Sequence, residues 1–336
     1  MKKNILRSNI IQILKKHKLS KKHAEICADH LIKAEIVEAK SHGLMRLKMY
    51  CDRIKKNLIN PTPKIKIKKI NSSVSLIDAN NSIGFVSADI GISQAIKNAK
   101  KNGVGLVAVK NSGHYGLSSF YAERAVKENL VVFCFTNAPP AIAPHGAKKS
   151  LFGTNPICFG APAGKIPFIL DTSTSKINRG KIRRAQKLNE KIPYGVALDK
   201  FGNITTNATK ALKGTQLPMA GFRGSGLAWM VDILSGVLTG SSHGGKTKDP
   251  FDDFSGPQNV GHLFITIDSK IFIGKKFISE MKKNIRLVKK LPKAKGFKSI
   301  FYPGERKNKL YKKNSNKDIP LSPEILNQME KLNAIK

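Results

Sequence analysis

The 336-residue sequence has few cysteines and no long apolar run. Its four cysteines, Cys27, Cys51, Cys134 and Cys158, form no CxxC pair and lack the spacing of a metal site. We therefore expect reduced core residues, no metal centre and a cytoplasmic protein. No stretch approaches the ~18 consecutive apolar residues of a membrane span. The N-terminus also lacks the apolar segment of a signal peptide, so we expect no membrane association.

Acidic residues are scarce as well. Asp and Glu number 22 against 60 Lys and Arg, which gives a formal net charge of +38. Such an excess can bind polyanions, but the lysines run from Lys2 to Lys336 without a basic patch interleaved with aromatic residues. We expect no specific nucleic-acid partner, and a basic nucleic-acid-binding protein is kept as the alternative outside the enzymes.

The common phosphate-binding loops are also missing or out of place. No G-x-G-x-x-G turn occurs, which argues against a Rossmann fold. Residues 240–247 match the Walker A pattern literally, but an apolar helical pattern precedes them. A P-loop needs a strand before it and a helix after it, so we interpret the match as chance and expect no role for Lys246. A P-loop ATPase is the remaining alternative.

Hydrophobic periodicity predicts a mixture of helices and strands. Ser20 can cap a helical region that runs to residue 58. Helices are expected over 4–16, 20–58, 87–102, 118–128, 224–240, from about 275 onwards and over 322–333. Strands are expected over 64–80, 103–111, 130–137, 167–171 and 262–268. The spacing shows no regular βαβ array, so the predicted class is mixed α/β (α+β).

Residues 136–162 are largely apolar and are interrupted by prolines and glycines. Proline removes backbone donors and glycine raises the entropic cost of a helix, so a regular helix is excluded. The segment is too apolar to remain a solvated linker. We expect irregular backbone held against the core, beside a binding site.

Two histidines are candidates for proton transfer. His42, Arg46 and Tyr50 are spaced i, i+4 and i+8, so they share one face if residues 34–56 are helical. A histidine can move a proton near neutral pH, and an arginine can bind a carboxylate with two hydrogen bonds. His114 lies in a glycine-bracketed turn after a predicted strand. A solvated His/Arg face and a structural turn histidine are the alternative interpretations.

Further polar residues follow predicted strands or precede helices. Asp171 ends a predicted strand, where it could bind a ribose or support a histidine. Arg223 lies among Gly221, Gly224 and Gly226 at the start of an apolar helix. Free N–H groups and an arginine at this place suit a phosphate, although close helix packing explains the glycines equally well.

Eight segments occur together in a recognisable order. They are EAKSHGLMRLKMY, NSGHYGLSSFYAERA, residues 136–162, LDTSTSKINRGKI, IPYGVALDKFGNITTNATKAL, GFRGSGLAWMVDILSGVLTG, PQNVGHLFITID and YPGE. This order resembles the malate/L-lactate dehydrogenase family of the second type, over nearly the whole chain. The resemblance implies a non-Rossmann NAD(P)-binding α/β domain (66–284), a mainly helical domain built from both termini (1–65 and 285–336), and a homodimer.

The resemblance also implies site residues. Ser41, His42 and Arg46 match the family's catalytic segment, and the proton-transferring histidine is either His42 or His114. Cofactor contacts are implied for Ala138 (through its backbone only), Asp171, Thr172, Ser173, Arg223, Gly224, Gly304, Glu305 and Arg306.

The activity implied by the resemblance is reversible hydride transfer between NAD or NADP and a small 2-oxo acid. Malate, lactate, sulfolactate or ureidoglycolate would be the corresponding 2-hydroxy acid. Reduction of a cyclic imine such as piperideine- or pyrroline-2-carboxylate is the alternative within the family. The sequence leaves open the exact substrate and the choice between the two cofactors.

Overall fold

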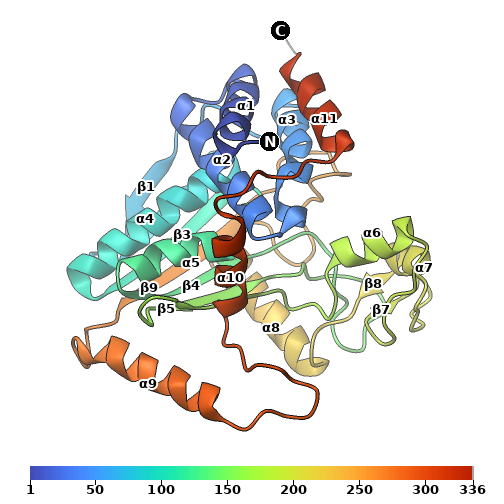
Figure 1. Cartoon of the computed structure of the whole chain (residues 1–336). Helices are drawn as coiled ribbons and strands as arrows, with labels where there is room; N and C mark the ends of the chain where they lie inside the picture. The colour runs from blue at the N-terminus through green and yellow to red at the C-terminus, as the bar shows by residue number, and fades with distance from the viewer. Residues whose placement is uncertain (335–336) are drawn as a thin grey trace.

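A seven-stranded sheet organises residues 1–334, which are described here by a computed structural model (Figure 1). The strands are β1 (Lys66–Lys69), β2 (Val74–Asp78), β3 (Val104–Ser112), β4 (Leu130–Thr136), β5 (Ile157–Ala161), β6 (Phe168–Thr172) and β9 (Val260–Asp268). Their order is β1-β2-β3-β9-β4-β5-β6, and only β2 and β3 pair in parallel. The mainly antiparallel sheet confirms the mixed α/β class and differs from a Rossmann sheet.

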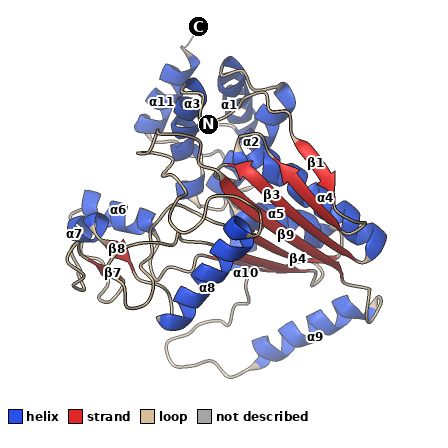
Figure 2. Ribbon diagram, turned by 180° about the vertical axis from the view of Figure 1, so that it is seen from behind, coloured by secondary structure: helices blue, strands red, loops and turns tan. Residues whose placement is uncertain are grey.

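Both faces of the central strands are buried, because alternate side chains of a strand point to opposite faces. In β3, Val107 and Val109 pack beneath α4 (Gly84–Asn102) and α5 (Ser118–Lys127). Leu106 and Ala108 face the opposite layer. That layer consists of α8 (Phe222–Asp232) and a π-helical turn, η3 (Ile233–Val237), seen from behind in Figure 2.

The two ends of the chain pack together in a second core. Apolar side chains of α1 (Lys3–Lys16), α2 (Lys21–Ile36), α3 (Leu47–Lys55) and α11 (Pro323–Asn333) share one buried cluster. The amino group of Met1 donates to the Ile319 carbonyl (2.9 Å), and Figure 1 shows α1 and α11 at the same end of the molecule. The domain boundaries given above remain a prediction.

The prediction of one helix over 20–58, which would have put residues 34–56 on one helix, is wrong. Helix α2 begins after its Ser20 cap, as expected, but it ends at Ile36, and Glu38 adopts a left-handed conformation (φ 59°). Two short 3-10 turns follow, η1 (Lys40–His42) and η2 (Leu44–Arg46). The chain turns back because a Glu35 carboxylate oxygen accepts the Leu44 N–H (2.8 Å). A side chain at position 43 would collide with that carboxylate, which explains Gly43.

Residues 177–216 form a small lobe beside the sheet (Figure 1). It contains α6 (Arg179–Lys187), β7 (Ala197–Leu198), α7 (Ala208–Lys213) and β8 (Thr215–Gln216). Asn178 and Asn207 cap the two helices by accepting the N–H groups of Gly180 (2.7 Å) and Lys210 (2.9 Å). A buried cluster of small and branched side chains holds the lobe together.

Two further helices lie between β9 and α11 in the chain. Helix α9 (Lys276–Lys290) buries none of its residues, whereas α10 (Glu305–Asn314) crosses in front of the sheet in Figure 1. Among residues 1–334, no helix has the length and apolar character needed to cross a bilayer.

The segment 136–162 is irregular up to residue 156, as expected, and then enters β5, which was not expected. Ile142 forms isolated β-bridges with Phe152 and Gln216, so the loop is attached to the lobe.

The Walker A match also fails structurally, because residues 240–247 follow a π-helical turn and lead into further turns.

Candidate active site

His42 and His114 lie side by side although they are distant in sequence. Their rings stack with centroids 5.6 Å apart and an interplanar angle of 27°. His42 comes from the 3-10 turn η1, and its Nδ1 lies 3.0 Å from Ser41 Oγ. His114 comes from the turn after β3. The fold thus brings three of the predicted catalytic residues into one place without the common helix face expected from the sequence.

His114 is held from several directions. Its backbone N–H donates to Gln258 Oε1 (3.2 Å), and its Nδ1 lies 2.6 Å from the Tyr50 hydroxyl. The turn itself is fixed because Tyr121 donates to the Tyr115 carbonyl (2.6 Å).

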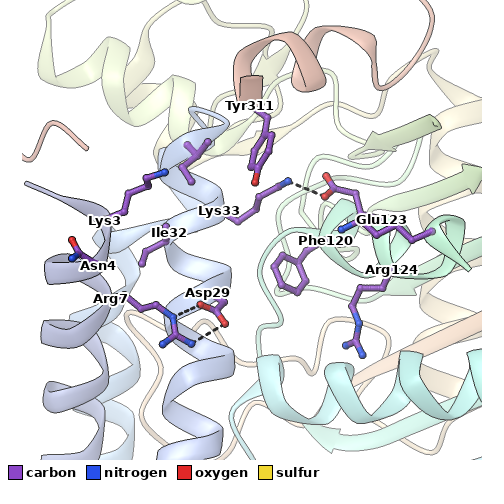
Figure 3. A pocket seen from close by; sticks show the side chains of 12 residues that line it. Lys3, Asn4, Arg7, Asp29, Ile32, Lys33, Phe120, Glu123, Arg124 and Tyr311 are labelled. Atoms are coloured by element: carbon purple, nitrogen blue, oxygen red, sulfur yellow. Dashed lines mark hydrogen bonds and ion pairs between the residues drawn. The ribbon is translucent and has the colours of Figure 1, made fainter. Parts of the chain in front are cut away.

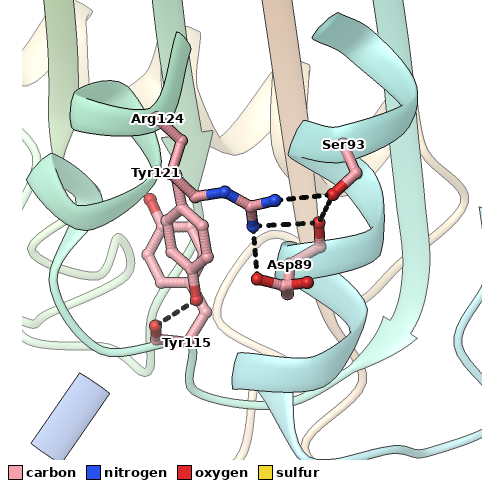
Figure 4. A network of polar contacts seen from close by, with 5 residues as sticks. All are labelled: Asp89, Ser93, Tyr115, Tyr121 and Arg124. Carbon is pink, nitrogen blue, oxygen red and sulfur yellow. Dashed lines mark hydrogen bonds and ion pairs between the residues drawn. The ribbon is translucent and has the colours of Figure 1, made fainter. Parts of the chain in front are cut away.

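Figure 4 shows the polar network that supports this turn. Arg124 of α5 pairs with Asp89 of α4 and also donates to Ser93 Oγ (2.8 Å). These contacts join the two helices that flank the turn, so the imidazole of His114 is placed by rigid elements.

The environment keeps both histidines neutral at pH 7. Burial, followed by the nearby charge of Arg46, lowers the pKa of His42 to about 4. Burial and Arg46 also hold the pKa of His114 well below its usual value. Burial raises the pKa of Tyr50, so its hydroxyl stays protonated. A neutral imidazole carries one N–H, and a Tyr50 proton donated to Nδ1 leaves that N–H on Nε2.

Arg46 lies next to the histidine pair with most of its donors free. Its Nε donates to the Ser41 carbonyl (2.7 Å), and its guanidinium carbon lies 5.0 Å from the centre of the Phe251 ring. No carboxylate within residues 1–334 pairs with it at ion-pair distance. A half-buried guanidinium without an acidic partner is suited to binding a carboxylate from outside the chain.

Asp171 lies near His42, at the end of β6. Its Oδ2 accepts the backbone N–H of Ser119 (3.1 Å) and pairs with the Lys307 ammonium (2.9 Å). Burial acts to raise the pKa of Asp171, but Lys307 and the Ser119 hydrogen bonds outweigh it and lower the pKa overall. The resulting carboxylate acts to raise the pKa of His42. The sequence did not predict Lys307, which follows directly after the expected residues 304–306.

The other residues expected to bind the cofactor lie in connected loops. The backbone of Thr174 bonds to Thr154 and Met219 (both 2.9 Å), so residues 172–174 join the 136–162 segment to the start of α8. The N–H of Ala138 already donates to Asn155 Oδ1 (3.1 Å). That group is therefore not free for a ligand.

Two helices begin in this neighbourhood without a side-chain cap. Helix α8 starts after Gly221 with Arg223 in its first turn, and α10 starts after Gly304 with Arg306 in its first turn. Free backbone N–H groups combined with an arginine fit the phosphates of a dinucleotide. Gly224 has a packing role, because a side chain there would collide with the Met219 carbonyl.

Two of the expected cofactor residues have no direct polar contact with the histidine pair in the described part of the chain. The Glu305 carboxylate pairs with Lys289 (2.7 Å) of α9, a structural contact. No hydrogen bond or ion pair within residues 1–334 joins Arg223 to His42, His114 or Asp171.

A separate cavity of about 370 Å³ lies between α1, α2, α5 and α10. Figure 3 shows that ion pairs cross it, including Arg7 with Asp29 and Lys33 with Glu123 (2.8 Å). None of the candidate catalytic or cofactor-binding residues lines this cavity, although Arg124 of the network that supports His114 does. Its internal pairing is consistent with a polar junction between helices.

Comparison with known proteins identifies the family. The sequence profile described as malate/L-lactate dehydrogenase matches residues 1–330. A malate/(S)-sulfolactate dehydrogenase of Methanothermus fervidus is 37% identical over 326 residues, covering 97% of this chain and 95% of the relative. The solved sulfolactate dehydrogenase of Methanocaldococcus jannaschii superposes with a TM-score of 0.93 at 35% identity, covering 99% of this chain and 96% of the other.

Other relatives differ in named cofactor and substrate. The NAD(+) ureidoglycolate dehydrogenase of Escherichia coli is 33% identical and covers 85% of this chain and 82% of its own length. The NADP(+) (2R)-3-sulfolactate dehydrogenase of Chromohalobacter salexigens is 37% identical and covers 74% and 75%. A delta1-piperideine-2-carboxylate reductase structure from Pseudomonas syringae has a TM-score of 0.89 at 26% identity, covering 99% of both chains.

The profile, the Methanothermus relative and the Methanocaldococcus structure each span nearly the whole chain, which confirms the resemblance inferred from the sequence. The chain belongs to the malate/L-lactate dehydrogenase family of oxidoreductases.

Proposed function

We propose that this enzyme transfers a hydride reversibly between NAD(P)H and C2 of a small 2-oxo acid. The observation that carries the proposal is the stacked pair of neutral histidines, His42 and His114, beside the guanidinium of Arg46, which no described carboxylate pairs with. This combination offers a proton source, a hydrogen-bond donor and a carboxylate-binding group around one point.

Arg46 binds the substrate carboxylate and thereby changes the acidity of the site. After burial, its positive charge is the main influence that lowers the pKa of both histidines. A bound carboxylate neutralises that charge, so the pKa of each histidine rises when substrate arrives. Proton transfer is thus favoured only in the loaded site.

His42 is assigned to proton transfer, because it is the histidine with a carboxylate in its surroundings. Asp171 acts to raise the pKa of His42 and stabilises the imidazolium that forms when the hydroxy acid is oxidised. The charged and titratable groups around His114 lower its pKa instead. His114 therefore remains neutral and donates a hydrogen bond to the carbonyl oxygen, with Tyr50 fixing its orientation.

The chain offers a consistent set of groups for a nicotinamide dinucleotide. The uncapped starts of α8 and α10, with Arg223 and Arg306, would hold phosphates. Thr172 and Ser173 supply hydroxyl groups next to Asp171. When bound, the cofactor supplies the hydride; the residues named here bind, orient and exchange the proton.

Reduction of a cyclic imine is a second candidate, favoured by the similarity to the piperideine-2-carboxylate reductase. The same geometry serves it, because Arg46 can bind the ring carboxylate and His42 can exchange a proton with the nitrogen. Arg46 and His42 therefore do not distinguish a carbonyl substrate from an imine substrate.

We also propose a homodimer in the cytoplasm. An apolar face on α8 and η3 is exposed, with Phe222 at 75%, Trp229 at 59% and Val237 at 53% exposure. Exposed patches of this kind mark protein interfaces. The four cysteines are buried and unpaired, as in a reducing compartment. Sedimentation of the wild type and of Trp229→Asp tests the dimer, because the variant should shift toward monomer.

The activity is tested by measuring NADH and NADPH oxidation with oxaloacetate, pyruvate, sulfopyruvate and piperideine-2-carboxylate. His42→Gln and His114→Gln should each lower kcat by roughly 10²–10⁴-fold, the usual contribution of a positioned acid or donor. Full activity in both variants would remove the histidine pair from the mechanism.

A further inference from the structure

Two guanidinium groups approach the same aromatic ring at the edge of the site. The guanidinium carbon of Arg46 lies 5.0 Å from the centre of the Phe251 ring, and that of Arg183 lies 5.4 Å from it. Phe251 is held in place because its N–H donates to Asp249 Oδ1 (2.8 Å). The ring therefore links the site to α6 of the small lobe, which carries Arg183.

A second contact places α6 over the same region. A side chain at Gly180 would lie 3.7 Å from Ser41 Cβ, so the first turn of α6 lies next to the residue that precedes His42. Residues three apart share a helix face. Arg183 thus extends from the α6 face that is directed toward Ser41 and Arg46.

The two positive charges have no ion-pair partner among the described residues. No carboxylate in residues 1–334 lies within ion-pair distance of Arg46 or Arg183. Asp249 is nearby, but its Oδ1 accepts the N–H groups of Phe251 and Asp252 (3.3 Å). The charge of Arg183 is among those that act to lower the pKa of Arg46, so the two guanidinium groups lie near enough to interact, and an anion beside them would relieve their repulsion.

We propose that Arg183 binds a second anionic group of the substrate, on the carbon chain beyond C2. This inference rests on the proposed function. The substrate is then a 2-oxo acid that carries a carboxylate or a sulfonate at C3, whereas pyruvate would occupy only the Arg46 half of the site. A guanidinium binds such anions at N–O distances of about 2.8 Å, and both guanidinium groups lie at the same Phe251 ring.

Arg183 lies where its side chain can be replaced without disturbing the fold. Its side chain is exposed, and α6 is anchored by Ile182 and Ala185 in the core of the lobe and by the Asn178 cap. Replacement of Arg183 should therefore leave the fold intact. Arg184, the next residue, is also exposed and makes no contact with Phe251, so Arg184→Gln is a matched control that removes the same charge.

The experiment measures kcat and KM of the wild type, Arg183→Gln and Arg184→Gln with oxaloacetate, sulfopyruvate and pyruvate. We expect Arg183→Gln to raise KM for the two dianions by ~10- to 100-fold, because hydrogen bonds to charged groups contribute about 1.5–3 kcal/mol. Its kcat and its KM for pyruvate should change little, and Arg184→Gln should resemble the wild type. A lower KM for sulfopyruvate or for oxaloacetate identifies the group as sulfonate or carboxylate.

Two outcomes would overturn the inference in distinguishable ways. If Arg183→Gln raises KM equally for pyruvate and the dianions, or for none of them, Arg183 binds no second anion, although the proposed function stands. If the wild type reduces no 2-oxo acid at all, the proposed function fails and the inference fails with it.

Discussion

Replacement of Tyr50 by phenylalanine should reduce turnover while leaving most of the packing intact. The Tyr50 hydroxyl lies 2.6 Å from His114 Nδ1 and has no other hydrogen-bond partner among the described residues. The ring itself packs against Phe85, with centroids 5.1 Å apart, and phenylalanine keeps that contact. The substitution therefore removes one hydrogen bond and little else.

The size of the decrease in turnover follows from the loss of the hydrogen bond at the His114 imidazole. Nδ1 of His114 would become a polar atom without a partner, which costs about 1–3 kcal/mol. Tyr50 fixes the orientation and tautomer of the imidazole that the transition state needs. If this free energy is lost there, kcat decreases by ~5- to 150-fold. KM should change less, because Arg46 still binds the carboxylate.

The assay compares steady-state kinetics and thermal unfolding of Tyr50→Phe with those of Tyr115→Phe. Tyr115 is equally buried, and its hydroxyl bonds to Ser118 (2.7 Å) rather than to a site histidine. Both variants should lose some stability, but only Tyr50→Phe should lose turnover. Equal kcat values in the two variants would refute the role given to Tyr50 in orienting His114.

Three further predictions concern charge. Lys307→Met removes the ammonium that keeps the pKa of Asp171 low. Because Lys307 is 38% exposed, the variant should lose only ~1–2 kcal/mol of stability. Its pH profile of kcat should be flatter than that of the wild type, and an unchanged profile would show that Asp171 does not act on His42. Burial lowers the pKa of His262 to about 3, whereas in the unfolded chain the imidazole takes up a proton near pH 6.5. The free energy of unfolding, measured with urea at pH 7.5 and pH 5, should therefore fall toward pH 5 by about 1–2 kcal/mol per buried histidine. The variant His262→Gln should show a smaller fall. Lys246→Ala should leave both activity and ATP binding as in the wild type, and a loss of activity would give the Walker A match a role after all.

Local patterns were sufficient to predict most helices and strands. The predicted strand over 130–137 is β4, and the helix over 118–128 is α5, because alternation and helical periodicity both reflect burial on the central sheet. Ser20 caps α2 as expected. The same reasoning could not find β5, which follows a loop rich in proline and glycine.

The end of α2 was not predictable, because its cause is tertiary. No glycine or proline follows Ile36 directly, and Glu38 has a left-handed backbone without a local sequence signal. The turn depends on the Glu35 carboxylate, which accepts a hydrogen bond from Leu44 (2.8 Å) across the bend. Gly43 did indicate a close approach, and its neighbour is that carboxylate.

Only part of the site could be predicted, because some of its residues are distinguished only by their tertiary contacts. His42, Arg46 and His114 carry chemistry that is visible in a sequence, and the fold brings them together. Lys307 carries no such signal in a chain with 60 Lys and Arg residues, because only its contact with Asp171 distinguishes it. Arg183 is equally inconspicuous until the lobe places it at the Phe251 ring.

The central claim is tested most directly by following the transferred hydrogen. The wild-type enzyme would be incubated with NADH or NADPH deuterated at C4 and with oxaloacetate, and the product would be analysed by mass spectrometry and NMR. The account predicts one 2-hydroxy acid for each cofactor oxidised, with deuterium at C2. Cofactor oxidation without deuterium at C2, or no reaction with any 2-oxo acid, would contradict it.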